Sequence, residues 1–137
     1  MFFNKKKDNN HEFDFIKVGA LLIHAAKIDE NYSQEEEDII KNTLISLGAD
    51  KSNLETLIAK AKQCEEDANQ ILDFTREIKN LEEIDKIKII KSLWKIIYSN
   101  KDADIYETNL MRRLAGLLYI DSKVMGDIKK EIKKENL

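Results

Sequence analysis

The chain of 137 residues has the length of a single domain, and 42% of its residues are hydrophobic, which suffices for one core. It contains 4 Gly and no Pro, whereas β-sandwiches and barrels need such residues in their turns, so long helices are favoured instead. The formal net charge of −3 argues against a nucleic-acid partner, because nucleic-acid binders usually carry a basic balance.

Cysteine usage and apolar segments indicate a cytoplasmic protein without stable membrane insertion. The single cysteine, Cys64, has no partner for an intramolecular disulfide, which fits a reducing compartment. The longest uncharged apolar stretch, Val18–Ala26, is far shorter than the about 20 residues that span a bilayer. We expect residues 1–11 to form a flexible tail, with a weak membrane or partner contact through Phe2 and Phe3 as the alternative.

Apolar residues recur at helical spacing over residues 12–137, which predicts one all-α domain of about seven helices. The first helix is expected from about Glu12 to Ile28. The second should start after Ser33, whose partner three residues on is Glu36, a capping-box pattern. It should end near Gly48, which suits the left-handed residue that follows many helices.

The remaining helices are predicted from caps and from the width of their apolar stripes. Asp50 or Ser52 is expected to cap the third helix and Asp67 the fourth, although these two helices are also compatible with one continuous helix. Asn80 with Glu83 is expected to cap a fifth helix, whose wide apolar stripe predicts a central position. The caps expected for the sixth and seventh helices are Asp104 and then Asp121 or Ser122.

Two stretches of the chain match at an offset of 71 residues, from position 29 to position 100. The offset pairs Ser33 with Asp104 and Glu36 with Glu107, so cap positions fall on cap positions. We therefore predict two related helical hairpins packed around one core. The same offset pairs His24 with Lys95, which places His24 at a rim and argues against a buried ligand role, because lysine is rarely buried unpaired.

The duplicated pattern resembles the TerB family, a helical domain associated with tellurite resistance. The resemblance rests on AAKIDENYSQEE in the first copy and on IIYSNKDADIYETNLMRRLAGLL in the second. It implies a small bacterial domain of about seven helices, with a role in stress response, metal-ion resistance or protein scaffolding. Carried over by position, the acidic residues of the family fall on Asp29, Glu36, Asn100 and Glu107.

Those four residues are the predicted metal site, with Ca²⁺ or Mg²⁺ as the candidate ion, because hard divalent cations prefer oxygen ligands. The alternative needs no metal, since Ser33 with Glu36 and Asp104 with Glu107 are explained as helix caps. An EF-hand is rejected: the position that should hold its bidentate glutamate is Ile40 in the first loop, on a core face.

Two charged regions suggest further contacts. Glu35–Asp38 is explained as a solvated helix start, with a docking face for a basic partner as the alternative. We expect a basic surface on the last two helices. It is explained either by contact with an anion or phospholipid or by ordinary ion pairs spaced along the helix. It comprises Arg112, Arg113, Lys129, Lys130, Lys133 and Lys134.

No nucleophile–base set, metalloprotease motif or phosphate-binding glycine loop occurs in the sequence, so we do not expect an enzyme. We therefore interpret the chain as a TerB-like cytoplasmic binding or scaffold module, with protein partners and weak divalent-cation binding at the duplicated loops. A purely structural protein–protein interaction module without a metal site is the alternative. A homodimer is compatible with either reading.

Overall fold

The computed structural model describes residues 10–28, 32–99 and 104–135, while the side chains of residues 10, 11 and 104–108 lie outside that description. These residues form seven α-helices, one 3₁₀ turn and no strand, which confirms the predicted all-α class. The elements are α1 Asn10–Lys27, α2 Gln34–Ser46, the turn Lys51–Asn53, α3 Leu54–Asp67, α4 Leu72–Ile78, α5 Glu83–Tyr98, α6 Asp104–Leu117 and α7 Ser122–Glu135.

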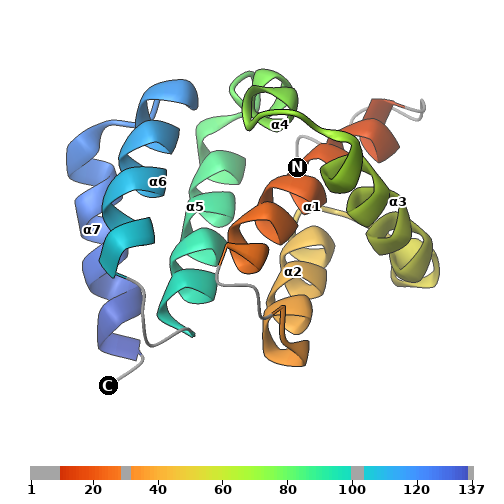
Figure 1. The fold of residues 1–137 in the computed structure, drawn as a ribbon, viewed down its shortest axis with the longest axis horizontal. Helices are drawn as coiled ribbons and strands as arrows, with labels where there is room; N and C mark the ends of the chain where they lie inside the picture. The colour runs from red at the N-terminus through yellow and green to blue at the C-terminus, as the bar shows by residue number, and fades with distance from the viewer. Residues whose placement is uncertain (1–9, 29–31, 100–103, 136–137) are drawn as a thin grey trace.

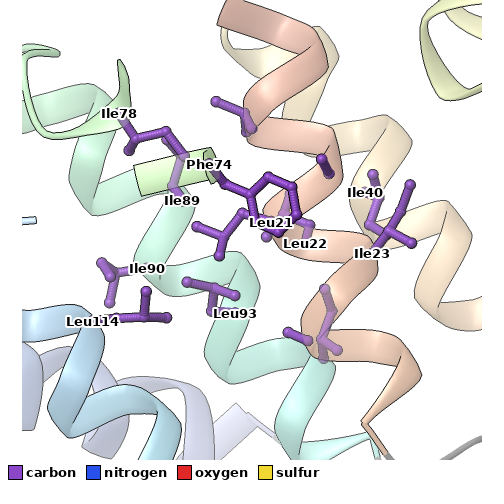
Figure 2. Close-up of a cluster of buried hydrophobic side chains, with 14 of the residues drawn as sticks. Leu21, Leu22, Ile23, Ile40, Phe74, Ile78, Ile89, Ile90, Leu93 and Leu114 are labelled. Carbon is purple, nitrogen blue, oxygen red and sulfur yellow. The ribbon is translucent and has the colours of Figure 1, made fainter. Parts of the chain in front are cut away.

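Helices α1 and α5 form the centre of the bundle (Figure 1). Helix α1 contacts α2, α3, α4 and α5, whereas α5 contacts α1, α2, α6 and α7, which confirms the central position predicted from the wide apolar stripe of α5. Figure 2 shows part of the buried core around these two helices, to which α2, α4 and α6 also contribute side chains. The labelled members are Leu21, Leu22, Ile23, Ile40, Phe74, Ile78, Ile89, Ile90, Leu93 and Leu114.

The ends of α2 and α6 carry the same terminal hydrogen-bond pattern. After α2, the amide of Ala49 donates to the carbonyl of Leu44 at 2.9 Å, across Gly48 with its φ of 114°. After α6, the amide of Ile120 donates to the carbonyl of Ala115 at 2.9 Å, across Tyr119 with its φ of 58°. Both are Schellman-type ends, and Gly48 ends α2 as predicted.

Gly48 and Tyr119 lie 71 positions apart, the offset that the internal match gives. The ends of α1 and α5, Lys27 and Tyr98, are separated by the same interval. These coincidences support a duplication. The relation of the whole hairpins by a rotation stays a prediction.

The expected caps of α4 and α5 are wrong. Asp67 is the last residue of α3 and accepts a hydrogen bond from the side chain of Gln63. The two helices are separate because the next residue, Ala68, is extended, with φ −79° and ψ 141°. The side chain of Asp73, in the first turn of α4, accepts hydrogen bonds from the amides of Asn69 and Gln70, just before the helix. Helix α5 starts at Glu83 rather than just after Asn80, because the intervening Leu81 turns into the core and is buried.

None of the helices in the described ranges is long and apolar enough to cross a membrane. Helix α1 begins at Asn10, two residues before the predicted start. Of the expected tail, residues 1–9 lie outside the described part of the chain.

Candidate functional site

The two helix–helix connections that carry the predicted ligands start from the same side of the molecule. In Figure 1, the ends of α1 and α5 and the starts of α2 and α6 all lie along the lower edge of the bundle. A direct contact links the two halves there, because the hydroxyl oxygen of Ser99, after α5, lies 3.5 Å from Oε2 of Glu36, in the first turn of α2. The sequence places these residues 63 positions apart.

Glu36 is a buried carboxylate, with 3% of its surface exposed, and it forms a reciprocal capping box with Ser33. The backbone amide of Ser33 donates to Oε1 of Glu36 at 2.8 Å, and the amide of Glu36 donates to the hydroxyl oxygen of Ser33 at 3.2 Å. The Ser33 hydroxyl also lies 3.2 Å from Oε1. One carboxylate oxygen is therefore committed to the start of α2.

The other carboxylate oxygen faces the C-terminal end of α5. The Ser99 hydroxyl lies 2.6 Å from the carbonyl of Ile96 and 3.5 Å from Oε2 of Glu36, and its one proton can be donated to either oxygen. A helix C-terminus carries partial negative charge on its last carbonyl groups. The Glu36 carboxylate and the Ser99 hydroxyl thus bring together oxygen atoms from the two halves of the chain, which is the ligand type that a hard divalent cation prefers.

The surroundings shift the pKa values of two neighbouring side chains in opposite directions. Burial, together with the charges of Glu37 and Glu36, raises the pKa of the Tyr32 phenol. Burial alone would raise the pKa of Glu37 as well, but hydrogen bonds from Lys62 and Lys41 outweigh it and lower that pKa. The ammonium nitrogen of Lys62 lies 3.1 Å from Glu37, and that of Lys41 lies 3.3 Å from it.

Of the predicted ligand set, only the side chain of Glu36 is described. Asp29 and Asn100 lie outside the described residues. Glu107 and the expected cap Asp104 belong to α6, but their side chains lie outside the description too. Within the described ranges there is no group of three or more His, Cys, Asp or Glu side chains able to hold a metal ion.

Sequence reasoning missed Ser99 and Tyr32 as members of this region. Ser99 stands one position before Asn100 in the second loop, but nothing in the sequence indicates that it contacts the start of α2. Tyr32 directly precedes the capping serine, and the Lys62 ammonium lies 5.5 Å from the centroid of its partly buried aromatic ring. Both contacts join residues that are distant along the chain, so helical periodicity does not reveal them.

The other residues that the sequence singled out have structural partners. His24 lies at a rim, as predicted, and its Nδ1 atom is 3.3 Å from Oε2 of Glu65. The other carboxylate oxygen of Glu65, Oε1, accepts from Lys27 at 2.7 Å. Cys64 is a partly buried free thiol. Within the acidic run, Glu37 forms the ion pairs with Lys41 and Lys62, so this part of the helix start is not an unpaired acidic face.

Comparison with known proteins gives one result. The family model described as "Tellurite resistance protein TerB" matches residues 15–130 of the chain. No curated protein and no solved structure matches. The matched span contains both helix–helix connections and the whole region around Glu36.

Proposed function

The chain belongs to the TerB family, and from this premise we propose that it is a non-enzymatic, cytoplasmic binding module that contributes to stress or tellurite-type metal-ion resistance. Its proposed mechanism is weak binding of Ca²⁺ or Mg²⁺ where the two hairpin connections meet. The ligands proposed are Asp29, Glu36, Asn100 and Glu107. Protein partners complete the role as a scaffold, and no nucleic acid is involved.

The observation that carries this proposal is the placement of Glu36. Its side chain is 3% exposed, and its Oε2 atom lies 3.5 Å from the hydroxyl oxygen of Ser99, at the end of α5. Oxygen atoms from the two halves of the chain therefore come together at this point. Carboxylate and hydroxyl oxygens are the ligand type that a hard divalent cation prefers.

A second function is favoured by the capping box. Because Ser33 and Glu36 satisfy one another at the start of α2, the role of this pair in folding needs no ion. In that case the chain is a purely structural protein–protein interaction module. The two functions differ in whether the region around Glu36 responds to divalent cations.

Titration with CaCl₂ and then MgCl₂, followed by backbone NMR, tests the site. We expect amide shifts confined to the residues around Ser33, Glu36 and Ser99 at millimolar ion. The variant Glu36→Gln should lose the shifts but keep the fold, because glutamine also serves at this position of a capping box. Glu55→Gln is the matched control, since Glu55 is an 81% exposed carboxylate paired with Lys41.

The outcomes separate the two functions. An ion response that is lost in Glu36→Gln and kept in Glu55→Gln supports the cation site. No response to either ion at millimolar concentration, or an equal response in both variants, overturns it and leaves the structural module.

A further inference from the structure

The cleft between α2 and α5 is lined by hydrogen-bond donors and cations. It is open to solvent and has a volume of about 240 Å³. Helix α2 contributes Asn42, Thr43 and Ser46 to its lining, and helix α5 contributes Lys88, Lys91 and Lys95. Within the described part of the chain, no aspartate or glutamate lines it. The cleft therefore has the charge of three lysines and no carboxylate of its own.

The three lysines lie on one face of α5, because they are spaced three and four positions apart. From Lys88 to Lys95 the helix rises by about 10 Å, at about 1.5 Å per residue. The positive charge is therefore distributed along the cleft instead of being gathered at one point. An anion that contacts all three ammonium groups has to be elongated and has to carry several charged groups.

Two of the ammonium groups already have partners. Nζ of Lys88 donates to the carbonyl oxygen of Ser46 at 3.1 Å, which orients the side chain through a neutral acceptor. Lys91 has a carboxylate partner, because its Nζ lies 3.6 Å from Oε1 of Glu131, but the Glu131 side chain is 53% exposed and such surface pairs contribute little. Neither contact occupies all three protons of its ammonium group.

Two further donors of the lining have no acceptor on the protein. Lys95 on α5 and the side-chain amide of Asn42 on α2 form no hydrogen bond or ion pair with any residue that the structure describes. Both side chains are exposed, so water satisfies them in the free protein. Because they line the same cleft from opposite helices, an anion between the helices can accept from both.

The buried part of the lining is polar and already satisfied. The hydroxyl groups of Thr43 and Ser92 contact one another, and each has an acceptor on its own helix. That acceptor is the carbonyl of Ile39 at 2.7 Å for Thr43 and the carbonyl of Lys88 at 3.0 Å for Ser92. In the described part of the chain, Ile39 is the only apolar residue of the lining, and no aromatic ring belongs to it. A large apolar side chain or a stacked nucleobase therefore finds no matching surface in the cleft.

We propose that the cleft between α2 and α5 binds a chain of phosphate groups, either a free inorganic polyphosphate or the phosphates of a nucleotide. Lysine binds phosphate as a point charge, and a phosphate chain carries several negative charges within a short length. Lys95 and Asn42 donate to the chain from opposite helices, and the other two lysines contribute charge along it. The proposal goes beyond the proposed function and needs no divalent cation, although the cleft begins one helical turn from the contact between Glu36 and Ser99.

Backbone and side-chain amide NMR of the full chain, in EDTA and at low ionic strength, tests the proposal with sodium tripolyphosphate as the probe. We expect saturable shifts at millimolar probe that are confined to residues 42–46 and 88–95 and include the side-chain amide of Asn42. Orthophosphate should bind at least about tenfold more weakly, because it contacts fewer of the lysines. ATP should bind within about threefold of tripolyphosphate, since no aromatic ring in the cleft stacks on its base.

Matched variants test the named residues. Lys95→Gln should weaken tripolyphosphate binding by about fivefold or more, whereas Lys123→Gln should change it by less than about twofold. Lys123 is an exposed lysine at the start of α7 that does not line the cleft, so both variants remove the same charge. Glu131→Gln should strengthen binding by about two- to threefold because it releases Lys91, and Asp127→Asn, which removes the same charge from the same helix, should not.

Three results would overturn the proposal. The absence of shifts in residues 42–46 and 88–95 at millimolar tripolyphosphate would show that the cleft binds no phosphate chain. Equal losses in Lys95→Gln and Lys123→Gln would indicate general charge attraction, and tighter binding of acetyl-EEEEEE-amide than of tripolyphosphate would indicate an acidic protein segment instead. Because EDTA is present throughout, the cation site can fail without affecting this test, and Glu36→Gln should bind tripolyphosphate within about twofold of the parent chain.

Discussion

The closest approach between α1 and α3 predicts opposite effects for two glycine-to-alanine substitutions. Gly19 lies in α1, and a Cβ atom added there would be 2.9 Å from the Cβ of Ala61 in α3. Carbon atoms in ordinary contact are about 3.5–4.0 Å apart, so the helices would have to separate by at least about 0.6 Å. Gly126 lies within α7, where an added Cβ would meet no heavy atom within 4 Å.

Magnitudes follow from these two environments. Alanine gains about 0.8–1 kcal/mol over glycine inside a helix, and Gly126→Ala should stabilise the protein by up to that amount. Gly19→Ala has the same gain, but overpacking a buried contact typically costs about 1–3 kcal/mol. The two variants should therefore differ by about 1–3 kcal/mol in their free energy of unfolding, with Gly19→Ala the less stable.

Urea unfolding followed by far-ultraviolet circular dichroism measures this difference. A double-mutant cycle adds a sharper criterion, because Ala61→Gly removes the atom that the new Cβ would meet. The double variant Gly19→Ala/Ala61→Gly should be more stable than the sum of the single effects by at least about 1 kcal/mol. The reasoning is refuted if Gly19→Ala is as stable as Gly126→Ala, or if the cycle shows no coupling.

Three other substitutions test single features by urea unfolding. Asp85 is fully buried with both carboxylate oxygens unpartnered, and burial raises the pKa of its carboxyl, so protein stability should fall as pH rises from about 3.8 through that raised pKa. Asp85→Asn should abolish this fall, so the free energy of unfolding should rise by about 1–3 kcal/mol at pH 7 and stay the same at pH 3. Equal effects at both pH values would contradict the assignment to Asp85. Ser33→Ala should lose about 0.5–2 kcal/mol with the capping box, whereas Ser52→Ala, at an exposed position, should change stability by less than about 0.5 kcal/mol. Gly48→Ala should lose about 1–2 kcal/mol because Gly48 has a φ of 114°, and an unchanged urea midpoint would show that the turn relaxes.

The fold class, the capping box of Ser33 and the end of α2 at Gly48 were predictable because each depends on residues within about four positions of one another. The caps proposed for α4 and α5 were wrong because packing outweighed local preference. Asn80 is a good cap residue, but burial of Leu81 delays the start of α5. Local signals also left open whether α3 and α4 are one helix, whereas the extended backbone of Ala68 separates them.

Contacts between helices that are distant along the chain were not predictable from the sequence. Lys86 is buried on α5, and its ammonium group donates to the carbonyl of Leu118 at the end of α6 at 2.9 Å. The approach of Ser99 to Glu36 has the same character. Sequence periodicity indicates which face of a helix is buried but not which residues of another helix it meets, so neither of these two contacts was predictable.

The offset of 71 residues also relates the contact between α1 and α3 to the contact between α5 and α7. Gly19 and Ala61 correspond to Ile90 and Ile132, and all four residues are buried. Small residues let α1 and α3 approach closely, whereas the bulkier pair belongs to α5 and α7. If the two halves are duplicates, α5 and α7 should therefore lie farther apart than α1 and α3.

One more substitution tests the packing beside α5. Ala115 lines an open cleft of about 290 Å³ together with residues of α5, α6 and α7, and its counterpart at the same offset is Leu44, which is fully buried in the core. Ala115→Leu adds three carbon atoms to open space, and since each buried methylene contributes about 0.8 kcal/mol, partial burial should stabilise the protein by about 1–2 kcal/mol in urea unfolding. Loss of stability by more than about 1 kcal/mol would show that the space is not there.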